Sequence, residues 1–340
     1  MEKELGEIKA NLKKYGQEHI LNNFEELDET HQKELLKEIK GIDFELVTSL
    51  YNNTKKEKKN TKDEITPINY LDKFKLGDKY KYYENIGKKA IQEGKLAAVT
   101  MAGGQGTRLG HNGPKGTYDI GLDSHKSLFE LLSDGIKEEA KKYGVTIPWF
   151  IMTSRENNKT TVEFFEKHKY FGYQKDKNIF FFIQGELPMM DTEGKILIGE
   201  DGLIKLAADG HGGIYESLVK SGMTKKMKEL GVEWVFIGGV DNCLVKMVDP
   251  VLMGIAIDQQ VTVACKSVVK ANPQEKVGVF CKRNGKPNVI EYTEITDEMA
   301  EARDKDGELL YGESHILCNL FSVGAIERMG AEPLPYHVAY

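Results

Sequence analysis

Residues 96–110 read LAAVTMAGGQGTRLG, an apolar run that passes directly into a glycine-rich turn. A short apolar run closed by glycine is typical of a buried strand in an α/β sheet. Glycines at this point bring bare backbone to the edge of the sheet, where several N–H groups can converge on an anion. Arg108 and Lys115 add positive charge nearby. The stretch therefore predicts a phosphate-binding loop.

Three further apolar runs follow the same pattern, at residues 149–153, 179–184 and 234–240. Helix-like stretches at 127–143 and 162–169 lie between the earlier ones. An alternation of strand and helix is what a parallel sheet requires, because each crossover to a parallel neighbour needs a connecting helix. We therefore expect an α/β core.

The segments before and after this α/β core show different patterns of apolar residues. Apolar residues at helical spacing predict an N-terminal helical region over residues 1–94, with Leu5, Ile8, Leu12, Leu35, Leu36 and Ile39 as its inward faces. After Pro250, β-branched runs at 261–270, 276–281 and 289–295 indicate strands, and Asn284-Gly285 between the last two predicts a β-hairpin insertion. We expect the main domain at 95–325 and the start of a C-terminal region, cut short, at 326–340.

Bulk composition restricts the function. The 340 residues carry a net charge of −6, with 40% hydrophobic and 29% charged residues. This balance is typical of a soluble globular protein and argues against binding nucleic acid by bulk attraction or spanning a membrane. The acidic N-terminal residues do not form a secretory signal, so a cytoplasmic location is expected. Four widely spaced cysteines indicate reduced thiols.

Two familiar phosphate loops do not fit the turn at 103–110. A P-loop ends in Gly-Lys-Ser/Thr, whereas Lys115 follows Pro114. A dinucleotide fingerprint needs glycine or alanine where Leu109 stands, and an acidic residue that closes a second strand. An NAD-linked oxidoreductase is therefore only a weak alternative.

The motif instead resembles that of the uridylyltransferase family that makes UDP-sugars, in which Gly-Gly-x-Gly-Thr-Arg-Leu-Gly is followed shortly by Pro-Lys. Within this family of UDP-sugar pyrophosphorylases (UDPGP type 1), the chain is most similar to the UDP-N-acetylhexosamine pyrophosphorylase branch. Further matching segments occur in sequential order from 96 to 340, at residues 147–154, 168–172, 184–188, 209–215, 240–242 and 289–292.

The resemblance implies a Rossmann-like, GT-A-like nucleotidyltransferase fold with a mixed, mainly parallel sheet. It also implies a reaction in which a hexose 1-phosphate, N-acetylglucosamine 1-phosphate first, attacks the UTP α-phosphate in line and releases pyrophosphate. Glucose 1-phosphate as substrate is one alternative. A UDP-sugar-binding protein without catalysis is another, because family members continue into a C-terminal domain that supplies a further lysine.

Roles for individual residues also follow from the resemblance. Gly103 and Gly104 would cradle the nucleotide, while Arg108 and Lys115 would face the triphosphate. Asp241 comes directly after an apolar run, and its carboxylate suits Mg²⁺ held together with substrate phosphates.

Base and sugar contacts complete the set. Gln184 would pair with the uracil edge, since an amide both donates and accepts, and Gly210 would admit backbone close to the base. His211 stands where the branch usually has Asn and is closer to the UDP-glucose pattern, so the identity of the sugar stays open. The remaining expected substrate contacts are Gly278, Glu291 and Asn319.

Overall fold

The computed structural model describes residues 2–55 and 63–332. By their contacts, these residues divide into two compact units. Of the described residues, the first unit takes 2–55 and 185–213, and the second takes 63–184 and 214–332. The closing part of the expected C-terminal region, residues 333–340, lies outside the described residues.

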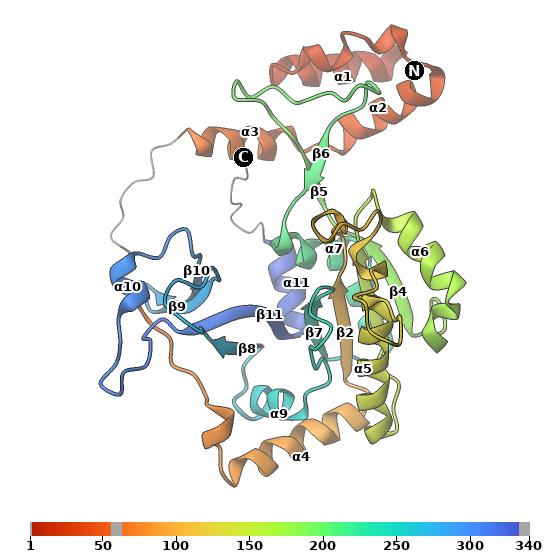
Figure 1. Cartoon of the computed structure of the whole chain (residues 1–340). Coiled ribbons are helices and arrows are strands. Elements are labelled where there is room, and N and C mark those ends of the chain that lie inside the picture. Colours follow the sequence, from red (N-terminus) through yellow and green to blue (C-terminus); the bar gives the residue numbers. More distant parts are fainter. Residues whose placement is uncertain (1, 56–62, 333–340) are drawn as a thin grey trace. The chain divides into compact units, whose positions relative to one another are not determined.

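The second unit is built on a mixed sheet in which four neighbouring strands at one end run parallel and the others are antiparallel (Figure 1). The four strands expected from the apolar runs are confirmed as β2 (Leu96–Met101), β3 (Trp149–Thr153), β4 (Ile179–Ile183) and β7 (Trp234–Gly239). They lie in the order β7-β2-β3-β4 and all run parallel. The antiparallel remainder comprises β11 (Glu313–Ser322), β8 (Val263–Val269), β9 (Val279–Arg283), β10 (Lys286–Ile290) and β1 (Ile65–Pro67).

Helices cover both faces of this sheet. Successive side chains of a strand point to opposite faces, so a strand that is apolar throughout must be covered on both. Leu96 and Ala98 of β2 pack into one core, and Ala97 and Val99 pack into the other. The first core is closed by α4 (Lys79–Gln92), α5 (Leu128–Tyr143), α6 (Asn158–Lys167) and α9 (Pro250–Asp258). The second is closed by α7 (Ile214–Lys220), α8 (Met223–Glu229) and α11 (Val323–Ala331). The expected α/β core is therefore confirmed as three layers.

Helices α4 and α9 cross at very short range. A methyl group added at Gly87 would lie 1.8 Å from the backbone oxygen of Pro250, and one added at Gly254 would lie 1.8 Å from that of Tyr83. Only glycine allows this backbone approach. Because α4 packs on α9, residues 63–94 belong to the second unit. The change from helical spacing to short apolar runs had instead predicted a domain boundary at Gly94.

The predicted hairpin is present as β9 and β10, joined at Asn284 and Gly285 with φ of +52° and +76°. These values suit the two-residue turn that Asn-Gly favours. The second strand covers Lys286–Ile290 rather than 289–295, because the chain turns after Ile290 and two backbone N–H groups donate to the Glu291 carbonyl. Through β9, the hairpin joins the main sheet beside β11.

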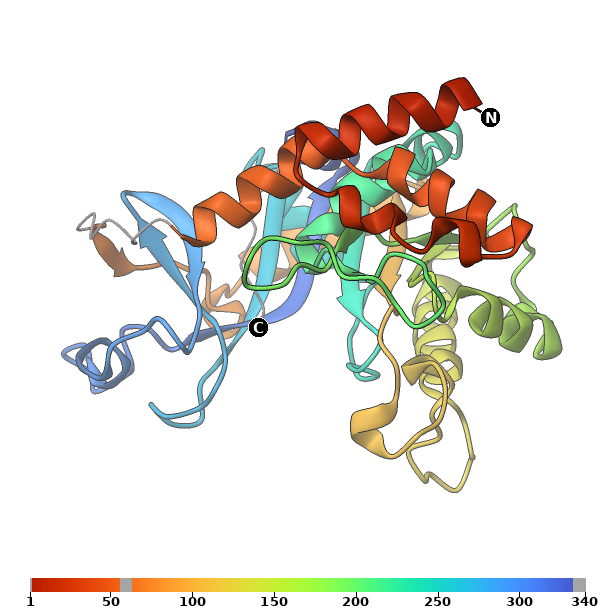
Figure 2. The same cartoon turned by 90° about the horizontal axis from the view of Figure 1, so that it is seen from above.

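The first unit combines the N-terminal helices with a long segment, residues 186–208, that we call the excursion. The helices are α1 (Glu2–Lys14), α2 (Glu29–Gly41) and α3 (Phe44–Thr54), and the excursion begins and ends with the paired strands β5 (Glu186–Pro188) and β6 (Leu206–Ala208). Leu12, Leu35 and Ile39 share a core with Ile196 and Ile204. Figure 2 shows the excursion running beside the helices. The helical spacing seen in the sequence is confirmed, but its partner segment was not foreseen.

Buried Gln17 joins the two parts of this unit. Its side-chain nitrogen donates to the Gly194 carbonyl at 2.7 Å, and its oxygen accepts from the Ile196 N–H at 3.0 Å. With both ends of its amide paired, Gln17 fixes the excursion against α1.

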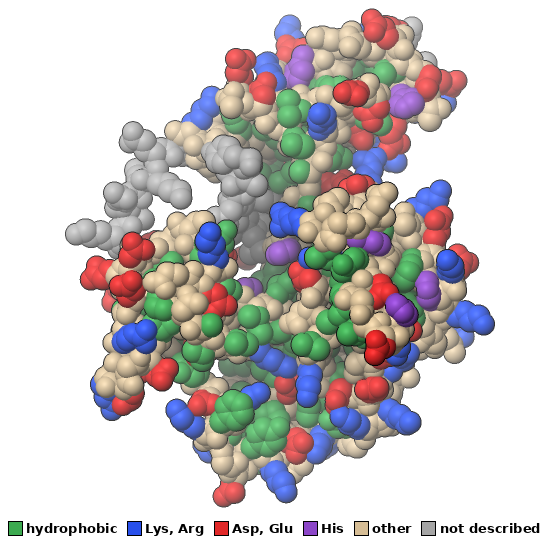
Figure 3. Space-filling model, in the orientation of Figure 1, with side chains coloured by type: hydrophobic (Ala, Val, Ile, Leu, Met, Phe, Trp, Pro, Cys, Tyr) green, Lys and Arg blue, Asp and Glu red, His purple; other side chains and the backbone are tan. Residues whose placement is uncertain are grey.

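On the face drawn in Figure 3, acidic and basic side chains of the second unit are interspersed. No helix among the described residues is both long enough and apolar enough to cross a membrane.

Candidate functional site

The glycine-rich turn leaves β2 and folds back on itself. The backbone N–H of Gly106 donates to the Gly113 carbonyl at 2.8 Å, and that of Lys115 donates to the Gly104 carbonyl at 3.1 Å. Gln105 and Pro114 form an isolated antiparallel bridge between these contacts. Residues 104–115 therefore form one closed loop that returns Lys115 to the edge of the sheet.

Gly103 lies directly against Gln184. A methyl group added at Gly103 would lie 2.5 Å from the Gln184 side-chain oxygen. The backbone of Gln184 is fixed at the end of β4, since its N–H donates to the Thr153 carbonyl at 2.8 Å. The first glycine of the loop is thus required for the seating of the Gln184 amide.

Asn157 supports the loop from below and was not singled out from the sequence. Its side chain is fully buried, and its nitrogen donates to the carbonyls of Ala102 at 3.0 Å and Gly104 at 3.4 Å. Its oxygen accepts from the Ser154 N–H at 2.9 Å. Its position could have indicated this role, because it is a polar residue just after the apolar run at 149–153. The carboxyl ends of such strands form the edge at which α/β sheets bind ligands.

Lys115 and Asp241 meet across the centre of the sheet. Lys115 Nζ lies 2.9 Å from Asp241 Oδ2. Asp241 comes just after β7 and its loop neighbour Val240, while Lys115 comes from the loop after β2, the strand next to β7. The chain builds the sheet outward from β2 through β3 and β4, then returns to place β7 on the other side of β2. Such a reversal of strand order opens the crevice in which α/β sheets bind ligands.

Arg108 lies in a short 3-10 turn, Thr107–Leu109, and is exposed. Within the part of the chain that the structure describes, its guanidinium has no hydrogen bond or ion pair. It is therefore available to an anionic ligand.

A second group of expected contacts gathers beside β11. Asn319, on this strand, is 6% exposed. Gly278 immediately precedes β9, and Glu291 immediately follows β10. A methyl group added at Gly278 would lie 3.2 Å from both carboxylate oxygens of Glu291, so these two residues are adjacent.

Gly210 and His211 belong to the first unit and are described with it. Gly210 has φ of +86°, in the left-handed region that favours glycine. His211 begins the 3-10 turn His211–Gly213 and is exposed.

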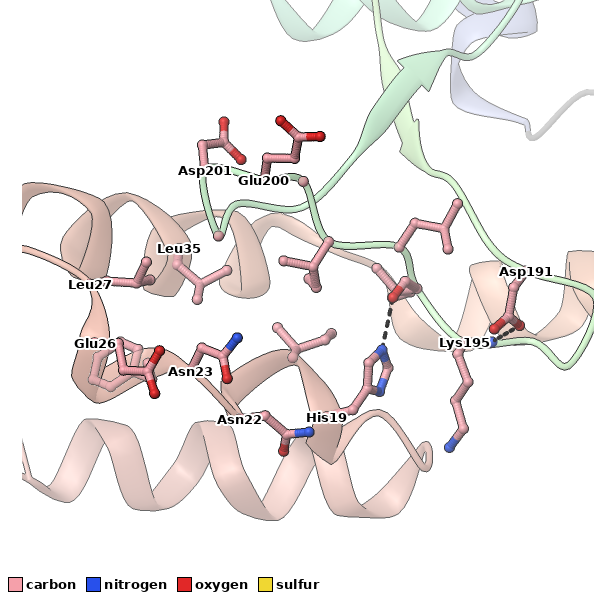
Figure 4. A pocket seen from close by; sticks show the side chains of 17 residues that line it. His19, Asn22, Asn23, Glu26, Leu27, Leu35, Asp191, Lys195, Glu200 and Asp201 are labelled. Carbon is pink, nitrogen blue, oxygen red and sulfur yellow. Dashed lines mark hydrogen bonds between the residues drawn. The ribbon is translucent and has the colours of Figure 1, made fainter.

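The first unit also contains a hollow of about 550 Å³ between the excursion and the turns after α1. Figure 4 shows Asn23, Leu27 and Leu35 on one side of it, and His19 hydrogen-bonded through Nε2 to the Ile196 carbonyl. None of the residues expected to bind substrate lines this hollow.

A divalent cation is compatible with the donor chemistry around Asp241. The described residues contain no cluster of three or more His, Cys, Asp or Glu side chains that could enclose a metal. Mg²⁺ does not require such a cluster, because it is commonly held by one or two carboxylates together with substrate phosphates. The Asp241 side chain is 62% exposed and folds back over Gly239, where a methyl group would lie 2.8 Å from its Oδ1.

Taken together, the loop, the two cations and the carboxylate at the reversal of strand order define a nucleotide-binding α/β protein suited to phosphoryl chemistry. A family model described as UTP–glucose-1-phosphate uridylyltransferase matches residues 43–332. The chain belongs to this family of uridylyltransferases.

Individual relatives refine the comparison. The chain is 37% identical over 343 residues to the UDP-N-acetylglucosamine pyrophosphorylase of Saccharomyces cerevisiae, covering 95% of this chain and 72% of the yeast protein. The solved structure of the Trypanosoma brucei uridine diphosphate N-acetylglucosamine pyrophosphorylase, in complex with inhibitor, matches with a TM-score of 0.78 and 32% identity, covering 95% of this chain and 68% of that one. A structure from Entamoeba histolytica, described as a UDP-N-acetylglucosamine pyrophosphorylase, matches with a TM-score of 0.74 and 35% identity, covering 81% of this chain and 70% of that one.

Proposed function

We propose that the protein is a Mg²⁺-dependent uridylyltransferase that forms UDP-N-acetylglucosamine and pyrophosphate from UTP and N-acetylglucosamine 1-phosphate. The names of the relatives support this choice of sugar. The observation that carries the reaction type is the meeting of Lys115 and Asp241 beside the glycine loop.

The chemistry needs no nucleophile from the protein. A phosphate oxygen of the sugar phosphate attacks the α-phosphorus of UTP, the bond from that phosphorus to the bridging oxygen breaks, and pyrophosphate leaves. Two anions must be brought together and their charge offset, so positioning and fixed positive charge are the main requirements. We assign both cations, Arg108 and Lys115, to the triphosphate.

In this proposal, Gly103 and Gly104 present backbone to the nucleotide, Gln184 pairs with the uracil edge, and Gly210 lies near the base. Asp241 would hold Mg²⁺, which supplies further positive charge at the phosphates when bound. The hexose is assigned to His211, Gly278, Glu291 and Asn319. A cytoplasmic location stays the prediction drawn from the sequence.

Pyrophosphate release tests the proposal directly. The protein is incubated with UTP, Mg²⁺ and one of three sugar phosphates: N-acetylglucosamine, N-acetylgalactosamine or glucose 1-phosphate. We expect the first to have the highest kcat/KM. A preference for glucose 1-phosphate would reassign the sugar. Binding of UDP-N-acetylglucosamine without turnover of any sugar would reassign the chain as a binding protein.

A further inference from the structure

Strand β11 is interrupted by a bulge just before Asn319. It pairs with β8 in one register up to His315, opposite Ser267, and in another from Asn319, opposite Cys265. Within the bulge, Leu317 has φ of +52°, in the left-handed region that residues other than glycine rarely adopt. Such strain persists only where the surroundings enforce it, and bulges beside active sites serve to re-aim a side chain.

The bulge brings the side chains of His315 and Asn319 together. Asn319 Nδ2 lies 3.3 Å from His315 Nε2. Because Nδ2 carries only hydrogens, Nε2 must accept in this contact, and a neutral ring then carries its proton on Nδ1. The contact fixes which end of the Asn319 amide points towards His315.

The other end of the same amide is the unusual feature. Asn319 Oδ1 is buried, yet no described group donates to it. A buried acceptor without a partner is costly, and native proteins rarely retain one without a reason. A ligand that brings an N–H or O–H group would satisfy it.

His315 is itself held in place from β9. Its backbone N–H donates to the Gly278 carbonyl at 2.8 Å, and its ring meets the Phe280 ring edge to face, with centroids 5.2 Å apart and an angle of 85° between planes. The ring therefore provides a rigid acceptor, and the amide that leans on it is oriented in advance of binding.

We propose that His315 is a positioning residue for sugar recognition: it orients the Asn319 amide so that Oδ1 is presented as an acceptor to a hydroxyl or acetamido N–H of the hexose. This inference rests on the proposed function and deepens it, because it names a residue to which neither the sequence nor the family likeness had given a role. His315 acts only through Asn319.

Calorimetric titrations with UDP and with UDP-N-acetylglucosamine separate the sugar contact from the nucleotide contact. In His315→Ala, we expect the affinity for UDP-N-acetylglucosamine to fall about tenfold, the size of effect expected from one buried hydrogen bond, while UDP affinity stays within about twofold. His315→Gln, whose side-chain oxygen can also accept, should recover most of the loss. His31→Ala, on α2, is the matched histidine control and should change neither affinity.

A double-mutant cycle makes the claim specific. In a protein that already carries Asn319→Ala, adding His315→Ala should have no further effect, because the residue through which His315 acts is gone. The proposal would be overturned if His315→Ala lowered the affinity for UDP-N-acetylglucosamine by the same factor with and without Asn319→Ala. It would also be overturned if His315→Ala lowered the affinity for UDP as much as the affinity for UDP-N-acetylglucosamine.

A measurement without ligand distinguishes this inference from the proposed function. Nitrogen-15 shifts of the His315 ring in the free protein should show a bare Nε2 and a proton on Nδ1, and Asn319→Ala should disturb that tautomer. A proton on Nε2 would overturn the inference whatever the protein binds. Failure of the wild type to bind either UDP or UDP-N-acetylglucosamine would overturn the proposed function instead. The tautomer of the His315 ring would still show whether His315 orients the Asn319 amide.

Discussion

Lys115 Nζ and Asp241 Oδ2 are 2.9 Å apart, although 126 residues separate them in sequence. The contact joins the loop after β2 to the loop after β7, across the crevice between neighbouring parallel strands. Each group has a second partner in the proposed reaction: the lysine pairs with phosphate, and the carboxylate binds a cation. In the structure, the two opposite charges pair with each other across this crevice.

Replacing Lys115 with Met should reduce catalysis with little effect on folding. Removal of one group that stabilises developing charge commonly lowers kcat by about 10²–10³-fold. The ion pair itself is partly exposed, so its loss should change the free energy of unfolding by no more than about 1 kcal/mol. Steady-state kinetics and thermal unfolding measure the two effects. Lys142→Ala, which removes a surface lysine of α5, is the control, and a kcat close to wild type in Lys115→Met would contradict the assignment.

Asp241→Asn tests the carboxylate. We expect kcat to fall about 10²–10³-fold, because the amide is a poor ligand for Mg²⁺ and the metal offsets phosphate charge. Raising the Mg²⁺ concentration should restore only part of the rate. Asp176→Asn, at an exposed turn with φ of +60° where Asn is well tolerated, should behave as wild type. Full activity of Asp241→Asn at ordinary Mg²⁺ concentrations would exclude Asp241 as the ligand.

The contact between Gly103 and Gln184 yields a matched pair of variants. In Gly103→Ala, the new methyl group would displace the Gln184 amide, which is the free end of a flexible side chain. We therefore expect the KM for UTP to rise about tenfold, as for a lost hydrogen bond, while the protein stays folded. A methyl group at Gly104 meets nothing within 4 Å, so Gly104→Ala should leave folding and Gln184 undisturbed. If Gly103→Ala binds UTP as wild type does, Gln184 has no role in recognition.

His211→Asn tests the choice of sugar. The resemblance places Asn at this position in the N-acetylhexosamine branch, so we expect the variant to raise kcat/KM for N-acetylglucosamine 1-phosphate relative to glucose 1-phosphate by about tenfold. His211 is exposed on a short turn, and its replacement should not alter stability. The panel of three sugar phosphates measures the ratio. An unchanged ratio would remove His211 from the specificity argument.

Much of the central fold could be predicted because its signals are local. The strand at 96–101 is an apolar run, except for Thr100, and leads through Ala102 into the glycine-rich turn. Asn284-Gly285 encodes a tight hairpin turn in two residues. Asp241 and Gln184 could be placed at the sheet edge for the same reason, since each follows such a run.

The rest depends on contacts between distant segments, which no local pattern encodes. Gln17 meets Gly194 and Ile196 only after the excursion has folded onto the N-terminal helices. Asn157 reads as an ordinary polar residue until the structure places its amide beneath the glycine loop. The role of His315 depends on a bulge in β11 that shifts its register with β8, and a one-strand pattern does not reveal such a shift.

The crossing of α4 and α9 gives a prediction for stability alone. A methyl group at Gly254 would lie 1.8 Å from the Tyr83 backbone oxygen, so the helices of Gly254→Ala must separate. Backbone cannot move aside as a side-chain end can, and overpacking of this kind costs about 1–3 kcal/mol. We expect a clear fall in the melting temperature, measured by calorimetry, with the kinetic constants of the folded fraction preserved.

Gly135→Ala is the matched control, because Gly135 also lies within a helix, α5, but a methyl group there meets nothing within 4 Å. Alanine reduces the entropy of the unfolded chain and suits a helix better than glycine, so this variant should be more stable by about 0.4–1 kcal/mol. The two substitutions are chemically identical and should shift the melting temperature in opposite directions. Stabilisation by Gly254→Ala would mean that α4 and α9 do not cross at this distance, and residues 63–94 would then lose the contact that assigns them to the second unit.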